Sequence, residues 1–213
     1  MIITGKYFNF EYSEKDADIA NEVLTVAEET YECVAAKFSI PKAEYRFNFK
    51  LCPDVEAYIE ATGKSKENYE SWMVGFADYA KRLLCILSPH VVEDRAYDDM
   101  IKVIRHEVVH IVFDSLGDPD AAPIGISEGV AVWLADQIET EYLESENYPT
   151  MIGLNDEDYF YDNDGYNYSG AYIKFLVEKF GADALKLVYT GAKQLDEYLY
   201  HGFEKEAILA IKN

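Results

Sequence analysis

The chain has 213 residues, of which 49% are hydrophobic and 15% aromatic, which is enough for a packed core in one generous domain or two small lobes. Forty acidic residues against 19 basic ones give a formal net charge of −21, and such a surface repels phosphate, which argues against a nucleic-acid or anionic-membrane partner. The three cysteines, Cys33, Cys52 and Cys85, are too few and too widely spaced for a disulfide framework or a cysteine zinc knuckle, so we expect buried, reduced thiols.

The N-terminal stretch MIITGKYFNFEYSEKD lacks the basic start and the apolar core of a secretion signal. No later segment reaches about 18 uncharged apolar residues, the length needed to span a bilayer. We therefore expect a soluble, cytoplasmic chain, although a signal removed earlier would leave no trace.

The first third of the chain shows strand and helix patterns in alternation. Residues 7–12 (YFNFEY) predict a strand with Phe8, Phe10 and Tyr12 on one face. Ser13 and Asp16 give a capping-box signal for a long amphipathic helix, which Pro41 stops. The apolar positions of this helix recur every three or four residues: Ala20, Val23, Leu24, Ala27, Tyr31, Val34, Ala35 and Phe38.

Further strands are predicted at residues 45–51 (YRFNFKL), 72–79 (WMVGFADY) and 83–88 (LLCILS). A short helix from Asp54 to about Thr62, ended by Gly63, separates the first two. The order is therefore strand, helix, strand, helix, strand, strand.

From Asp98 onward the period becomes helical. The loop 117–125 (GDPDAAPIG) precedes a second helix at residues 127–139, and an acidic, aromatic stretch precedes helices built on GAYIKFLVEKF and the C-terminal tail. We predict an α+β fold in which an N-terminal mixed β-sheet with a long helix (about 1–95) packs on a mainly helical C-terminal lobe (about 96–213), the two forming a single domain, 1–213.

The stretch RHEVVH carries the chemistry. On a helix, His106 and His110 are displaced by only about 40° around the axis and about 6 Å along it, so both imidazoles can face one ion. Glu107 lies beside them and can take a proton from a zinc-bound water, as HExxH requires in a metalloprotease. The alternative is an ordinary amphipathic helix with two surface histidines.

A catalytic zinc needs a third protein ligand. The residues after His110 contain no histidine at the familiar short spacing, and the better candidate is Glu128 in ISEGVAVW, at the start of the next predicted helix. Gly129 and Ala131 beside it leave room for a close approach of two helices.

HEVVH followed by PIGISEGVAVW resembles the gluzincin metallopeptidases, specifically the small peptidase MA-like family, over residues 6 to about 190. The resemblance implies a zincin-like fold, one zinc ion per chain held by His106, His110 and Glu128, Glu107 as general base, and a peptide or protein substrate. Gly125 and Ile126 stand where the family commonly has an aromatic–leucine pair, so we expect looser packing beside Glu128.

Aminopeptidase-type gluzincins carry a glutamate on the edge strand, whereas WMVGFADYAK contains Asp78 and no glutamate in the matching motif. The resemblance therefore favours an endopeptidase whose edge strand, at Gly75, Phe76 and Ala77, binds an extended substrate by strand addition.

Gluzincins typically add a tyrosine or histidine that stabilises the oxyanion. Tyr168, which opens a predicted helix, is the candidate, Tyr166 is the nearest substitute, and a purely structural tyrosine is the alternative. The aromatic residues around them either line a cleft or anchor their own loop. A catalytically inactive zincin-fold binding or scaffold domain is the rival function, and an acidic interaction module is a third, but the intact Glu107 argues against an inactive descendant.

Overall fold

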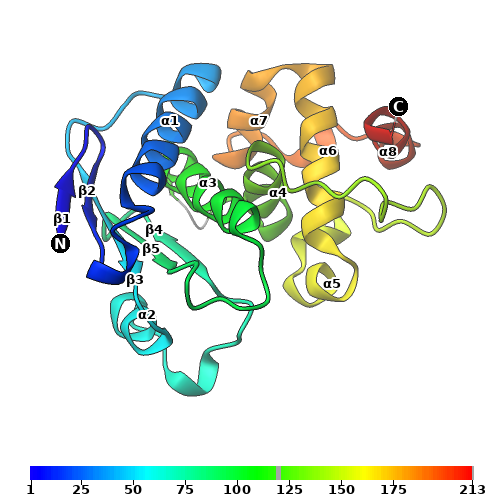
Figure 1. Ribbon diagram of the computed structural model, residues 1–213. Coiled ribbons are helices and arrows are strands. Elements are labelled where there is room, and N and C mark those ends of the chain that lie inside the picture. Colours follow the sequence, from blue (N-terminus) through cyan, green and yellow to red (C-terminus); the bar gives the residue numbers. More distant parts are fainter. Residues whose placement is uncertain (119–120, 213) are drawn as a thin grey trace. The chain divides into compact units, whose positions relative to one another are not determined.

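The computed structural model describes residues 1–118 and 121–212, and its strands and helices are labelled in Figure 1. The strands are β1 (Ile2–Thr4), β2 (Phe8–Glu11), β3 (Phe47–Cys52), β4 (Gly75–Asp78) and β5 (Leu83–Leu87). The α-helices are α1 (Ala20–Phe38), α2 (Val55–Thr62), α3 (Tyr97–Asp114), α4 (Ile124–Leu134), α5 (Glu157–Asp162), α6 (Gly165–Phe180), α7 (Ala182–Tyr189) and α8 (Phe203–Lys212). Short 3₁₀ turns are η1 (Glu14–Asp16), η2 (Lys66–Asn68), η4 (Gly153–Asn155) and η5 (Leu195–Glu197).

The chain divides into two compact units, Met1–Val112 and Phe113–Asn213. The division falls inside α3, later than the predicted lobe boundary near residue 95. Its physical reason is that the last residues of α3 pack within the second unit, where the Phe113 ring lies 5.1 Å from that of Tyr189.

The sheet of the first unit is mixed, with the order β1-β2-β3-β5-β4. β3 lies parallel to β2 and β5, while β1 and β4 run antiparallel to their neighbours. These strands and the helices confirm the α+β prediction at the level of a mixed sheet combined with helices. β4 is an edge strand, as predicted. β1 was not predicted, because its three residues are too few to show an alternating pattern.

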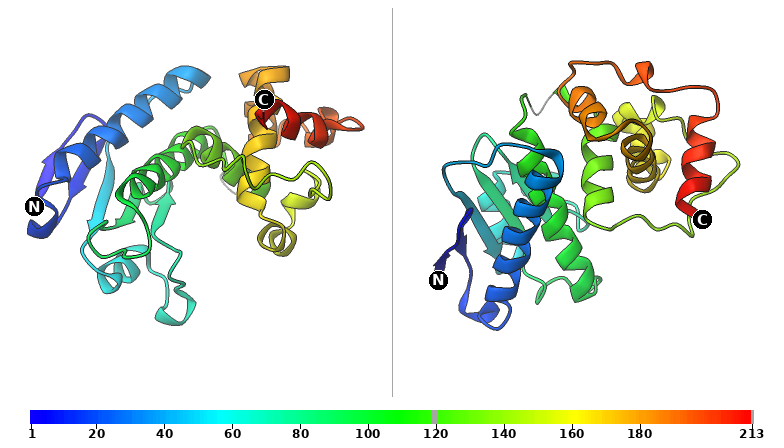
Figure 2. Two further views of the ribbon diagram at one scale, coloured as in Figure 1. Left: turned by 45° about the vertical axis from the view of Figure 1, so that its right-hand side comes forward. Right: turned by 90° about the horizontal axis from the view of Figure 1, so that it is seen from above.

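Helix α1 lies over one face of this sheet (Figures 1 and 2), and Tyr31 contacts the rings of Phe8 and Phe47. All eight apolar positions predicted for this helix are buried. The predicted cap at Ser13 is wrong, because the Ser13 hydroxyl donates to Asp16 within η1 and α1 begins only at Ala20.

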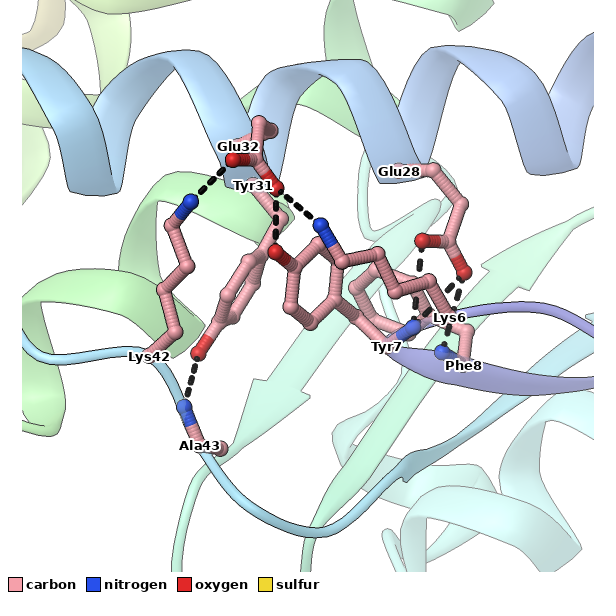
Figure 3. A network of polar contacts seen from close by, with 8 residues as sticks. All are labelled: Lys6, Tyr7, Phe8, Glu28, Tyr31, Glu32, Lys42 and Ala43. Atoms are coloured by element: carbon pink, nitrogen blue, oxygen red, sulfur yellow. Dashed lines mark hydrogen bonds and ion pairs between the residues drawn. The ribbon is translucent and has the colours of Figure 1, made fainter.

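Polar contacts attach α1 to the segments that flank the sheet (Figure 3). Glu28 accepts hydrogen bonds from two consecutive backbone N–H groups, and Glu32 accepts from three side chains. The donors to Glu28 are Tyr7 and Phe8, and those to Glu32 are Lys6, Tyr7 and Lys42. The Tyr31 hydroxyl accepts from the Ala43 N–H at 3.0 Å, so α1 is held along its second half.

The second unit is built around the packing of α4 on α6. A Cβ atom at Gly129 would lie 2.8 Å from the Ser169 carbonyl oxygen, and one at Gly170 would lie 2.6 Å from Val132. The small residue beside Glu128 therefore does allow close approach, as the sequence indicated.

Two expectations about α4 are wrong. The helix begins at Ile124, directly after Pro123, and ends at Leu134, so Glu128 lies in its second turn and not at its start. The packing at Gly125 is tight, because a Cβ atom there would lie 2.7 Å from the Leu154 carbonyl oxygen. A glycine is thus required where η4 crosses α4.

Two of the three cysteines match the expectation. Cys52 and Cys85 are buried and free, whereas Cys33 is exposed, since it lies on the solvent side of α1 between the buried Tyr31 and Val34. Among the described residues, no helix is long and apolar enough to cross a membrane.

Candidate metal centre

His106 and His110 lie one turn apart on α3, whose other side is apolar and buried at Ile104, Val108 and Ile111. Their Nε2 atoms are 3.1 Å apart and their rings are inclined by 70°. Two nitrogens at about 2.0–2.1 Å from one zinc ion, in tetrahedral arrangement, are about 3.4 Å apart. The observed pair therefore fits a single ion with little adjustment.

The Glu107 carboxylate lies against the edge strand. A Cβ atom built at Gly75 would lie 2.4 Å from Glu107 Oε1, so the carboxylate occupies the space that a side chain on β4 would fill. The Tyr58 hydroxyl donates to the Gly75 carbonyl at 2.6 Å. Burial, and secondly the negative charge of Glu107, raise the pKa of Tyr58. Glycine at position 75 thus brings the predicted base and the predicted substrate strand together.

The pairing of β4 decides which of its backbone groups face the sheet edge. The Leu87 N–H donates to the Val74 carbonyl at 2.8 Å, so Val74 points toward β5. Because alternate residues of an antiparallel strand point the same way, Gly75 and Ala77 point away from β5. The Gly75 carbonyl accepts a hydrogen bond from the Tyr58 hydroxyl. Ala77 is therefore the nearest residue of β4 at which the backbone of an added strand can pair.

Glu128 lies in α4 with an aromatic neighbour from α5. Burial chiefly raises the pKa of Tyr161, a hydrogen bond from Tyr166 lowers it, and the charge of Glu128 raises it again. Tyr161 is 49% exposed, and Tyr166 packs its ring on the buried Phe160 at 4.9 Å. The sequence pointed to Tyr161 only as one member of an aromatic cluster (Tyr159, Phe160, Tyr161, Tyr166 and Tyr168) that either lines a cleft or anchors its own loop, and no local pattern indicated its proximity to Glu128.

Tyr168 lies within α6 and not at its start, because that helix begins at Gly165. It is 5% exposed, and its hydroxyl accepts a hydrogen bond from the Glu144 N–H at 2.9 Å. This partner is the backbone of the 137–149 segment, which gives Tyr168 a structural role in the second unit.

Among the described residues, one ligand atom from each of His106, His110 and Glu128 lies within 4.8 Å of the others. All three side chains are half-buried. Two imidazole nitrogens and one carboxylate oxygen are a donor set typical of catalytic zinc, which leaves a fourth position open. The residues therefore fit the metal that the motif predicts.

No protein-family model matches the chain, and no curated protein is significantly similar to it.

Proposed function

We propose that the protein is a zinc-dependent metallopeptidase of the gluzincin type with a zincin-like fold, acting on internal peptide bonds. The observation that carries the proposal is the HExxH pair on α3, with its Nε2 atoms 3.1 Å apart and Glu107 held against β4. His106, His110 and Glu128 would hold one zinc ion per chain.

Zinc, when bound, polarises the scissile carbonyl and lowers the pKa of a coordinated water toward about 7. Glu107 takes the proton from the attacking water and passes it to the amine that leaves. Its carboxylate lies close to Gly75, on the strand that would hold the substrate.

The substrate would bind in extended form along β4, at Gly75, Phe76 and Ala77. Ala77 offers its N–H and carbonyl to the substrate backbone. The Asp78 carboxylate accepts from the Lys81 N–H at 2.8 Å and pairs with the Lys81 ammonium, so it is engaged within its own turn. This supports an endopeptidase over an enzyme that anchors a free amino terminus.

Metal analysis combined with two variants tests the proposal. We expect about one zinc ion per chain after zinc titration. Glu107→Gln should keep the zinc and abolish cleavage of a peptide library, because an amide cannot take the proton, whereas Glu128→Gln should weaken zinc binding as well.

A protein that takes up no zinc would refute the proposal. Zinc binding without any cleavage would instead support the rival binding or scaffold function, and equal loss of zinc from both variants would refute the roles assigned to Glu107 and Glu128.

A further inference from the structure

The hydroxyl of Tyr189, at the end of α7, lies between two charged or polar side chains of other helices. Tyr189 is 1% exposed, and its hydroxyl donates to Asp114 Oδ1 at 2.7 Å. Asp114 is the last residue of α3. The ring of Tyr189 also packs on Phe113 in the same turn, with centroids 5.1 Å apart.

The same hydroxyl has a partner on α4. A side-chain hydrogen bond joins Tyr189 to Ser127 and lowers the pKa of the phenol, although burial, first, and Asp114 raise it well above its usual value. The charge of Glu128 adds to that increase. One buried oxygen therefore connects the end of α3 with the first turn of α4.

Both ends of this connection are next to candidate zinc ligands. Asp114 follows His110 by four residues on one continuous helix, which places it about 40° around and about 6 Å along the axis. Ser127 immediately precedes Glu128. A bond that fixes Asp114 and Ser127 to one atom therefore holds the C-terminal end of α3 to the start of α4.

We propose that Tyr189 is a positioning residue for the metal centre, which sets the spacing of the His106–His110 pair and Glu128 through Asp114 and Ser127. The inference rests on the proposed zinc site. Zinc tolerates ligand distances only within about 0.2 Å of its preferred values, so a small change in the separation of two helices weakens binding.

Tyr189→Phe tests the inference, because it removes one oxygen and keeps the ring against Phe113. Zinc affinity is measured by competition with a chromophoric chelator, which requires no turnover. We expect roughly 10-fold weaker binding, the lower end of the effect typical of residues that orient metal ligands. The visible spectrum of the cobalt-substituted protein should also change, because it reports ligand geometry.

Tyr172→Phe is the matched control. Tyr172 is equally buried in the second unit, and its hydroxyl donates at 2.8 Å to the Pro149 carbonyl, which belongs to neither ligand-bearing helix. Its loss should lower stability without changing zinc affinity or the cobalt spectrum.

A second pair of variants separates positioning from stability. Ser127→Ala breaks the other end of the connection at a half-buried site and should also weaken zinc binding. In the double variant with Tyr189→Phe, the loss of zinc-binding free energy should be smaller than the sum of the two single losses, because both substitutions act through one oxygen.

The outcomes are distinct. A parent protein that binds zinc, together with Tyr189→Phe and Ser127→Ala variants whose zinc affinity equals that of Tyr172→Phe, would overturn the positioning role alone. A parent protein that binds no zinc would overturn the metal site and the positioning role together.

Discussion

Two glycines, Gly75 in the first unit and Gly129 in the second, each have another group in the space where a Cβ atom would lie. At Gly75 the space is taken by the end of the Glu107 side chain, whereas at Gly129 it is taken by the backbone of Ser169. A side chain can rotate away from an added methyl group, but a helix backbone cannot. The same residue type therefore makes room for the proposed base in the first unit and for helix packing in the second.

Gly75→Ala should break the first of these contacts and produce the largest effect. An added Cβ atom would displace the Glu107 carboxylate from β4, and a misplacement of about 1 Å can lower turnover about 100-fold. Stability should change little, because the obstructing group is a movable side chain. Peptidase assays and urea unfolding, together with zinc analysis, measure both quantities.

Retention of zinc is the internal control for Gly75→Ala, since the three atoms nearest to the added Cβ atom all belong to Glu107. Unchanged turnover in this variant would show that the carboxylate works equally well away from β4.

Gly129→Ala should give the opposite result. The added Cβ atom would lie 2.8 Å from a backbone oxygen of α6, and overpacking of this kind costs about 1–3 kcal/mol of unfolding free energy. Urea unfolding measures the loss. Gly117→Ala is the matched control in the same unit, because its added Cβ atom would meet Thr190 at an ordinary 3.9 Å. Equal stability of the two variants would contradict the close helix contact.

The elements of the first unit could be predicted wherever their pattern is local. Helix α2 begins after Asp54, whose side chain accepts from the Ala57 N–H, and ends at Gly63 with φ at 71°, as the capping residues indicated. The predicted start of α4 at Ser127 was wrong, since the helix already begins at Ile124, directly after Pro123.

For the candidate site, the sequence supplied the residues but not their surroundings. The HExxH spacing is local, so helix geometry alone predicted that His106 and His110 lie on the same side of the helix. The bond between Tyr189 and Asp114 joins residues 75 positions apart and leaves no local pattern. The contact between Glu107 and Gly75 likewise depends on how α3 packs on the sheet, which periodicity alone does not determine.

Tyr168→Phe extends the comparison to a hydroxyl of the second unit. Because this hydroxyl accepts from the Glu144 N–H, its loss should cost about 1 kcal/mol of unfolding free energy, with kcat unchanged. Urea unfolding and steady-state kinetics on one preparation give both values. A fall in kcat of roughly 10- to 1000-fold at constant stability would instead assign Tyr168 to the oxyanion.

Glu32 on the surface of α1 sharpens the contrast with Glu107. Hydrogen-bond donors hold the Glu32 carboxylate, whereas the Glu107 carboxylate lies in the space left by the missing side chain of Gly75. Hydrogen bonds from Lys42, then Lys6 and Tyr7, lower the pKa of Glu32 from 4.5 to about 2. A carboxylate with a depressed folded-state pKa stabilises the protein fully above its unfolded-state pKa, and this contribution is lost as the pH falls from 4.5 toward 2. Glu32→Gln should therefore destabilise the protein slightly at neutral pH, and the difference from the parent should vanish across that acid range.

The effect should be the smallest of the four, because the Glu32 side chain is 41% exposed and solvent and salt screen its interactions. Urea midpoints at a series of pH values measure it, with Glu56→Gln, which removes an ion pair to Lys66 alone, as the control. A constant difference between Glu32→Gln and the parent at every pH would mean that Glu32 stabilises α1 by packing and not by charge.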